Sequence, residues 1–136
     1  MSGFQLRPVG HVAGPLRTTA EAPRQGDEGA PEADLVFTDD VVEALRSLAP
    51  GDEVIVLTWL HEADRTALAV HPRGDTTRPL EGVFSTRSPH RPNPIGLHRV
   101  TVLGVHGQRV HVSGLEAIDG TPVVDVKPVL GDVADR

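Results

Sequence analysis

A nearly continuous apolar run at residues 53–60, EVIVLTWL, is the feature that most limits the possible folds of this chain. Its length suits one strand, and apolar side chains on both faces are typical of a strand in the middle of a sheet. Further runs of strand length lie at residues 5–13, 35–37, 66–70, 95–105, 109–113 and 122–128. These runs do not alternate regularly with helices, so the sequence lacks the βαβ rhythm of a parallel sheet.

One helix is predicted between the runs. Thr38 can cap a helix, and two aspartates follow it in the first turn, where the helix dipole favours negative charge. The next apolar residues fall at helical spacing, at Val41, Val42, Leu45 and Leu48. A Pro-Gly pair at residues 50–51 ends the element. Many short strands, one short helix and many turn residues predict a mainly β fold, a small closed or strongly curved β-barrel.

The whole chain sets further bounds. Its 136 residues suit a single domain, and it contains no cysteine, which excludes a disulfide framework and thiolate chemistry. The net charge of −6 argues against nucleic-acid binding through bulk electrostatics, although a local basic patch is still allowed. No apolar stretch is long enough to span a bilayer and no signal peptide is recognisable, so we expect a soluble, cytoplasmic protein.

Residues 82–94, GVFSTRSPHRPNP, form the most unusual stretch of the chain. The short apolar run at Val83 and Phe84 is interpreted as the end of a strand. Three prolines then stiffen a loop that carries two arginines, a histidine and an asparagine. A stiff loop with guanidinium groups indicates a preformed receptor for an anionic or planar polar ligand. A rigid surface turn with solvated charges is the alternative, and composition leaves both open.

Two other polar stretches flank predicted strands. Residues 14–33 are rich in Pro, Gly, Ala and acidic residues and are predicted to form a mobile loop. Residues 61–65, HEADR, begin like the zinc-protease pattern H-E-x-x-H, but Arg65 replaces the second histidine, so metal ligation is set aside. A polar cluster after a buried strand indicates either a pocket rim or a simple exit from the strand. The sequence contains no G-x-G-x-x-G motif after a strand, which argues against a Rossmann nucleotide site.

Four strings occur in order: PRQ at residues 23–25, LTWLHEADR at 57–65, GVFSTRSPHRPNPIGL at 82–97 and LEAIDGTPVVDVKP at 115–128. Together they resemble the TrmO family, also called the TsaA-like or UPF0066 family. Its members are S-adenosylmethionine-dependent methyltransferases built on a small β-barrel rather than on a Rossmann sheet. The resemblance covers nearly the whole chain. It implies an enzyme that methylates N6 of threonylcarbamoyladenosine in tRNA, at the nucleotide beside the anticodon.

The resemblance also implies a set of cofactor-binding residues. They are Pro23, Arg24, Gln25, His61, Glu62, Arg87, Leu97, Ala117, Ile118, Asp119 and Gly120. Arg24 or Arg87 can pair with the cofactor's carboxylate, and Glu62 or Asp119 can accept hydrogen bonds from its ammonium or ribose. Leu97 and the backbone of the Ile118 turn can hold the adenine by apolar contact and main-chain hydrogen bonds.

Methyl transfer from a sulfonium needs in-line placement more than it needs an acid or a base. Asp125 or Glu62 can accept the proton that the nucleophilic nitrogen loses, and no metal is expected. Asp125 and Lys127 share one face of the last strand, and a structural ion pair is the favoured alternative for Asp125. Members of the family form dimers, so the resemblance implies a homodimer whose four strings could meet across two subunits.

The chain departs from the family pattern in three places. Residues 18–22, TTAEA, replace an aromatic residue and a glycine before PRQ, and Val129 follows the KP motif where tyrosine is common. Bacterial members often carry a further C-terminal domain, whereas this sequence ends at Arg136. Binding of tRNA is therefore expected to rest on a local patch, with His90, Arg91, Asn93, Arg73 and Arg78 as the candidates.

Other functions remain open at the level of sequence. A methyltransferase of the same type could use a different acceptor. A non-catalytic barrel could bind S-adenosylmethionine or a nucleotide and act as a sensor or regulator, and a structural protein could keep a vestigial pocket.

Overall fold

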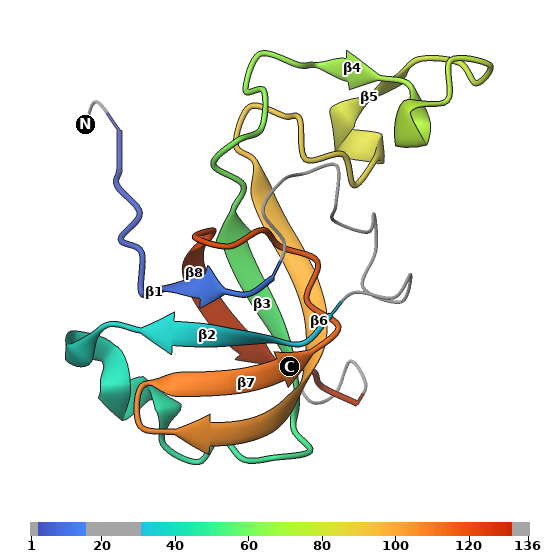
Figure 1. The fold of residues 1–136 in the computed structure, drawn as a ribbon. Coiled ribbons are helices and arrows are strands. Elements are labelled where there is room, and N and C mark those ends of the chain that lie inside the picture. The colour runs from blue at the N-terminus through green and yellow to red at the C-terminus, as the bar shows by residue number, and fades with distance from the viewer. Residues whose placement is uncertain (1–2, 16–30, 132–136) are drawn as a thin grey trace.

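The structure, a computed structural model, describes residues 3–15 and 31–131. Six antiparallel strands close into a barrel in the order β1-β2-β7-β6-β3-β8 (Figure 1). They are β1 (Gly10–Ala13), β2 (Ala33–Phe37), β3 (Glu53–Trp59), β6 (Ile95–His106), β7 (Arg109–Ser113) and β8 (Pro122–Pro128). The predicted mainly β fold is confirmed, and of the two predicted forms, closed or strongly curved, the structure has the closed one.

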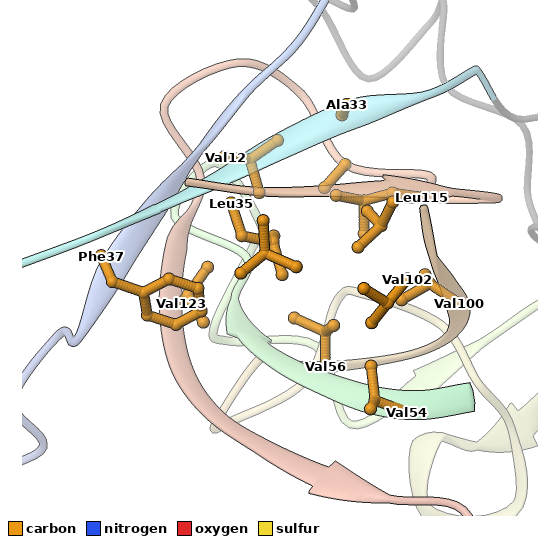
Figure 2. Packing of buried hydrophobic residues seen from close by; sticks show 13 residues of the cluster. Val12, Ala33, Leu35, Phe37, Val54, Val56, Val100, Val102, Leu115 and Val123 are labelled. Carbon is orange, nitrogen blue, oxygen red and sulfur yellow. The ribbon is translucent and has the colours of Figure 1, made fainter. Parts of the chain in front are cut away.

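Alternate residues of each strand point into the barrel. In β6, Val100 and Val102 are buried whereas Leu97 and Arg99 are exposed. Every barrel strand contributes to one apolar core, which is mostly valine because small β-branched side chains fit a narrow barrel (Figure 2). Its members are Val12, Ala33, Leu35, Phe37, Val54, Val56, Val100, Val102, Val110, Val112, Leu115, Ala117 and Val123.

Close approach and bulges shape the ring. A Cβ atom at Gly10 would lie 2.4 Å from the Val36 carbonyl oxygen, so only glycine lets β1 pair closely with β2 at this point. The β3–β8 register shifts between Leu57 and Thr58, and the β6–β7 register shifts between Val102 and Gly104. Such bulges bend strands, which helps a small sheet to close on itself.

Three long connections leave the barrel at the same end. In a ring of antiparallel strands, β1, β3 and β7 all run in one direction, opposite to β2, β6 and β8. The segments that follow them, residues 14–32, 60–94 and 114–121, therefore start together at what we call the loop end. The second segment, called the β3–β6 connection, rises above the barrel (Figure 1).

The predicted helix after Thr38 is a 3-10 helix, η2 (Asp39–Leu45). The Thr38 side chain makes no capping hydrogen bond; its hydroxyl donates to the Asp40 carboxylate and lies 3.4 Å from the Val9 carbonyl oxygen. The amphipathic spacing is nevertheless confirmed, since Val41, Leu45 and Leu48 pack half-buried against the barrel core.

Several predicted strands are shorter than expected. Only Gly10–Ala13 of residues 5–13 is a strand, because Pro8 has no N–H with which to extend the ladder. In the β3–β6 connection, β4 (Ala69–Val70) and β5 (Glu81–Gly82) pair over two residues each, with η3 (Pro72–Gly74) between them. Within the described residues, no helix is long and apolar enough to cross a membrane.

The interpretation of Val83 and Phe84 as the end of a strand is wrong. They begin the 3-10 turn η4 (Val83–Ser85), in which the Val83 carbonyl accepts from the Thr86 N–H at 3.1 Å. Two glycines have left-handed backbone conformations in turns between strands. Gly107 has a φ of 62° between β6 and β7, and Gly120 has a φ of 86° before β8.

Candidate functional site

The loop end collects most of the residues predicted to bind the cofactor. His61 and Glu62 directly follow β3, Arg87 lies in the loop before β6, and residues 117–120 precede β8. The connection between β1 and β2 also starts and ends here. Pro23, Arg24 and Gln25 belong to that connection but lie outside the described residues, so their role and the mobility of the loop remain predictions.

The turn at residues 117–120 is fixed on β1. The Gly14 N–H donates to Asp119 Oδ1 at 3.1 Å, and the Gly120 N–H donates to the Val12 carbonyl at 2.7 Å. The Ile118 carbonyl accepts from both the N–H and the hydroxyl of Thr121. Ala117 and Ile118 are buried, so this turn offers a ligand a rigid edge whose Ile118 carbonyl and Gly120 N–H are already occupied.

His61 and Glu62 lie at the exit of β3 with both side chains accessible to solvent. The His61 Nε2 atom is 3.8 Å from Glu62 Oε2. The backbone around them is held in place, since the Leu60 N–H donates to the Pro94 carbonyl at 2.8 Å and the Ala63 N–H donates to the Leu60 carbonyl at 3.0 Å. A fixed backbone with accessible imidazole and carboxylate groups suits a polar ligand.

Arg87 and Arg91 have different roles in the loop that the sequence singled out. The Arg91 guanidinium donates to the carbonyls of Thr86, Ser88 and Val83, so it organises the loop itself. The Arg87 side chain is exposed and has no hydrogen bond or ion pair within the described part of the chain. Of the two guanidinium groups, the one on Arg87 is therefore available to an anion.

His90 and Asn93, the other residues predicted to bind the substrate, each use one side-chain atom in a hydrogen bond that supports the loop. His90 Nδ1 accepts the Asp64 N–H at 3.0 Å, which leaves the proton of the neutral ring on Nε2. Asn93 Oδ1 accepts from Arg65 Nη2 at 3.2 Å. The Nε2–H of His90 and the amide NH2 of Asn93 remain as donors for a ligand. Thr66 donates two hydrogen bonds to Asp64, which lower the pKa of that carboxyl.

Arg65 was not predicted to have a functional role, yet it joins two of the family strings. Its Nε donates to the Pro92 carbonyl at 2.8 Å, and its guanidinium carbon lies 5.0 Å from the centre of the Trp59 ring. The hydrogen bonds from Arg65 to Pro92 and Asn93 fix the turn after β3 against the loop before β6, and the cation–π contact holds the guanidinium on the Trp59 ring. An arginine a few residues beyond the only tryptophan was the available signal, but sequence alone does not show that the two side chains stack.

Leu97 and Asp125 lie on the outer wall of the barrel. Both are in register with Leu57, on opposite sides of it in β6 and β8. Lys127 Nζ is 3.5 Å from Asp125 Oδ2, so the predicted ion pair forms. Both side chains are largely exposed, however, so solvent screens the pair and it contributes little to stability.

A buried polar cluster that the sequence analysis missed lies inside the barrel. His98 Nε2 and the Thr58 hydroxyl are 2.7 Å apart, and His98 Nδ1 is 3.8 Å from Glu116 Oε1. A Cβ atom at residue 96 would come within 2.4 Å of Thr58 Oγ1, so Gly96 makes room for the cluster. Burial lowers the pKa of His98 to about 4, and this loss of solvation outweighs the nearby carboxylate.

Charge is unevenly distributed along the chain. The β3–β6 connection carries five arginines and four carboxylates, whereas the rest of the sequence carries eight basic and fifteen acidic residues. The arginines are Arg65, Arg73, Arg78, Arg87 and Arg91. The local basic patch expected for RNA binding therefore has a counterpart in the β3–β6 connection, which carries one more basic than acidic residue in a chain of net charge −6. Among the described residues, no cluster of three or more histidines or carboxylates could hold a metal ion.

Comparison with known proteins identifies the family. The model of the tRNA-methyltransferase O N-terminal domain matches residues 11–135. The chain belongs to the TrmO family. Crystal structures of TrmO share its fold: one from Pseudomonas aeruginosa has a TM-score of 0.76 at 30% identity and covers 98% of this chain. Another TrmO crystal structure has a TM-score of 0.77 at 33% identity and also covers 98% of this chain.

Relatives in the TrmO family carry names that refer to the cofactor. A probable S-adenosyl-L-methionine-binding protein of Methanothermobacter thermautotrophicus is 43% identical over 130 residues, which cover 96% of this chain and 93% of the relative. An S-adenosyl-L-methionine-binding protein of Archaeoglobus fulgidus is 42% identical over 122 residues, covering 90% of this chain and 86% of the relative. The chain spans 60% and 62% of the two TrmO crystal structures.

Proposed function

We propose that this chain binds S-adenosylmethionine at the loop end of the barrel and methylates N6 of threonylcarbamoyladenosine beside the anticodon of tRNA. Membership of the TrmO family and the names of its relatives support this function. The observation that carries it is topological: the barrel brings the connections that bear His61, Glu62, Arg87 and residues 117–120 to one end. Because tRNA is the proposed substrate, we expect the protein in the cytoplasm.

The donor set at the loop end fits the cofactor. The free guanidinium of Arg87 suits its carboxylate, and the exposed carboxylate of Glu62 suits its ammonium or ribose hydroxyls. Leu97 offers an exposed apolar surface, and the rigid turn at residues 117–120 offers an edge for the adenine. When bound, the cofactor supplies an electrophilic methyl group on its sulfonium sulfur. The protein's part is to hold the acceptor nitrogen in line and to exclude water.

Two carboxylates remain candidates for accepting the proton that the N6 nitrogen loses. Glu62 lies at the loop end beside His61, and Asp125 lies on the outer wall beside Lys127. We favour Glu62, because Lys127 already contacts Asp125 and the ion pair would have to be disturbed. Replacement of Glu62 by Gln should lower both kcat and cofactor affinity, because the proposal places its carboxylate on the cofactor as well, while the same change at Asp125 should affect neither strongly.

A homodimer is part of this proposal. Leu97 is 45% exposed on the outer wall, whereas Ala117 and Ile118 are buried at the mouth of the barrel. Ile55, Leu57 and Ile95 extend the apolar surface around Leu97. A second copy covering this wall would bury it and could bring Leu97 to its partner's loop end. Ile95→Asp should shift sedimentation towards the monomer, whereas Leu80→Asp, in the β3–β6 connection, should not.

Cofactor binding and methyl transfer are tested together with radiolabelled S-adenosylmethionine and tRNA that contains threonylcarbamoyladenosine. Arg87→Ala should weaken cofactor binding about tenfold or more, because a charge-assisted hydrogen bond contributes roughly 1.5–3 kcal/mol. Arg46→Ala is the matched control, since Arg46 pairs with Glu43 on η2, outside the three connections at the loop end. Undiminished calorimetric affinity in Arg87→Ala would contradict the central assignment.

A second candidate function is a non-catalytic sensor of S-adenosylmethionine. It is favoured by the names of the archaeal relatives, which refer to binding and not to transfer. The same assay separates the two functions. Binding without methyl incorporation into tRNA, RNA or free nucleosides would support the sensor, and incorporation into another RNA would identify a different acceptor.

A further inference from the structure

A groove of about 380 Å³ lies beside the only tryptophan of the chain, and none of the residues assigned to the cofactor lines it. Three distant segments form it. Phe4 comes from the segment before β1, Trp59, Arg65 and Asn93 come from the end of β3 and the loop before β6, and Pro122 and Val124 come from β8. Its volume is at the lower end of the range of small-molecule sites.

The groove offers flat apolar surfaces. The Arg65 guanidinium lies over the Trp59 ring at 5.0 Å and presents its own planar face beyond it. Phe4 adds a second aromatic wall, and its side chain is 83% exposed and therefore accessible to a ligand. Val124 is the extra residue of a bulge in β8. Its neighbours Asp125 and Val123 lie opposite Leu57 and Thr58, which are consecutive residues of β3. Bulges re-aim side chains, and here Val124 lines the groove.

The polar edge of the groove contains donors and no carboxylate. Arg65 uses Nε and Nη2 on Pro92 and Asn93, which fixes the guanidinium plane and leaves Nη1 free to donate. Asn93 accepts through Oδ1, so its amide NH2 is the other free donor. None of the residues lining the groove is acidic. A ligand that fits must therefore be planar and must present acceptors at its edge.

We propose that this groove receives one unpaired nucleobase of the RNA substrate, stacked on the Arg65–Trp59 pair. The inference rests on the proposed function and extends it to a base that is not itself methylated. Unpaired bases in RNA are commonly recognised by stacking on aromatic rings and guanidinium planes, with hydrogen bonds to the base edge. An apolar segment of a protein would fit less well, because it would bury the Arg65 and Asn93 donors without acceptors.

The sole tryptophan makes the proposal directly measurable. With one tryptophan and no tyrosine in the sequence, the fluorescence of this chain reports on this groove. The probe is an anticodon stem-loop RNA with an unpaired loop, and the control is a fully paired RNA duplex of similar length. The stem-loop should quench Trp59 emission and the duplex should not. Anisotropy of labelled RNA measures binding independently.

Two variants separate stacking from support of the loop. Phe4→Ala should weaken stem-loop binding about fivefold or more, because one stacked base contributes roughly 1–3 kcal/mol. The S-adenosylmethionine affinity of this variant should stay unchanged, since Phe4 makes no contact that holds the loop end together. Arg65→Lys keeps the charge but loses the planar face, and should weaken stem-loop binding more than duplex binding.

Each other outcome would overturn the proposal. Stem-loop binding with unchanged Trp59 emission would place the RNA elsewhere, and equal quenching by the duplex would indicate phosphate contacts only. A change in emission that depends on protein concentration without RNA would assign the groove to a second copy of the chain. Failure of any RNA to bind would overturn the tRNA substrate as well, whereas unaffected binding by Phe4→Ala and Arg65→Lys would overturn the groove alone.

Discussion

The barrel and the β3–β6 connection are held together by different interactions. The barrel has continuous strand ladders around an apolar core to which every strand contributes. In the β3–β6 connection only Val83 and Pro94 are fully buried, and β4 and β5 pair over just two residues each. Its order comes instead from arginine side chains that donate to backbone carbonyls and from short turns such as the one at Asp64.

This difference fits the proposed function, in which the barrel supplies stability and the β3–β6 connection supplies residues that bind ligands. A densely packed core contributes most of the free energy of unfolding, whereas ligand-binding segments come from the less stable parts of a fold. The connection that supplies His61, Arg87 and the base-stacking Arg65 is such a part. Changes in the barrel should therefore lower global stability, and changes in the connection should mainly alter binding.

Removal of a core side chain should have the largest effect. Leu115→Ala should lower the free energy of unfolding by about 2–5 kcal/mol, because Leu115 is completely buried and the cavity cannot close fully. Leu80→Ala is the matched control in the β3–β6 connection, where Leu80 is 61% exposed, and should change stability by less than about 0.5 kcal/mol. Urea denaturation measures both. Equal losses would show that the connection packs as tightly as the barrel.

Acid should destabilise the barrel through His98. Its pKa is lowered from 6.5 to about 4 in the native state, so between these pH values the unfolded chain binds a proton that the folded chain does not. Stability should fall as the pH drops through this window, by up to about 3 kcal/mol for a shift of this size. Urea denaturation at several pH values measures the loss, and His98→Asn should flatten the profile. An unchanged profile in that variant would exclude His98 as the cause.

Loss of Arg91 should loosen the connection and leave the barrel folded. Arg91→Ala removes donors from the carbonyls of Val83, Thr86 and Ser88, so the amides of residues 83–91 should exchange hydrogen faster. The global free energy of unfolding should fall by about 1–2 kcal/mol. Arg87→Ala is the control, since Arg87 has no partner among the described residues and should change neither quantity. Uniformly faster exchange in the barrel would mean that both regions unfold as one unit.

The same comparison explains what the sequence could predict. The barrel strands β3, β6, β7 and β8 were predicted almost to the residue, because a run of alternating or continuous apolar side chains is a local signal. The family strings likewise located the loop-end segments at His61, Arg87 and Asp119 before the topology showed that they start together.

The contacts that organise the site were not predictable in this way. Thr58 and His98 are 40 residues apart, and Arg65 and Asn93 are 28 residues apart. A local sequence pattern does not predict a contact between two residues that are so far apart in the sequence. The sequence alone also does not show whether the histidine of a strand faces the core or the solvent. The 3-10 form of η2 was also missed, because the spacing of apolar residues that predicts a helix does not distinguish a short 3-10 helix from an α-helix.

The smallest predicted effect comes from His111, which links the barrel to the base of the β1–β2 connection. Its Nε2 is 2.8 Å from Glu32 Oε1 and its Nδ1 is 2.7 Å from Asp34 Oδ1. Hydrogen bonds to Glu32, which has the larger effect, and to Asp34 raise the pKa of His111 above its ordinary value of 6.5. The protonated ring therefore stabilises the fold, and this contribution is fully present at pH values below 6.5. This contribution should disappear as the pH rises through the raised pKa.

The loss on raising the pH should stay below about 1 kcal/mol, because the His111 side chain is 39% exposed and solvent screens the pair. Titration of the His111 ring protons by NMR measures the pKa, and urea denaturation on both sides of it measures the stability. Asp34 also pairs with Arg109 at 3.0 Å, so His111→Gln should remove the pH dependence while the Arg109–Asp34 pair keeps β2 and β7 joined. A pKa at or below the ordinary value would show that the two carboxylates do not hold the proton on the ring.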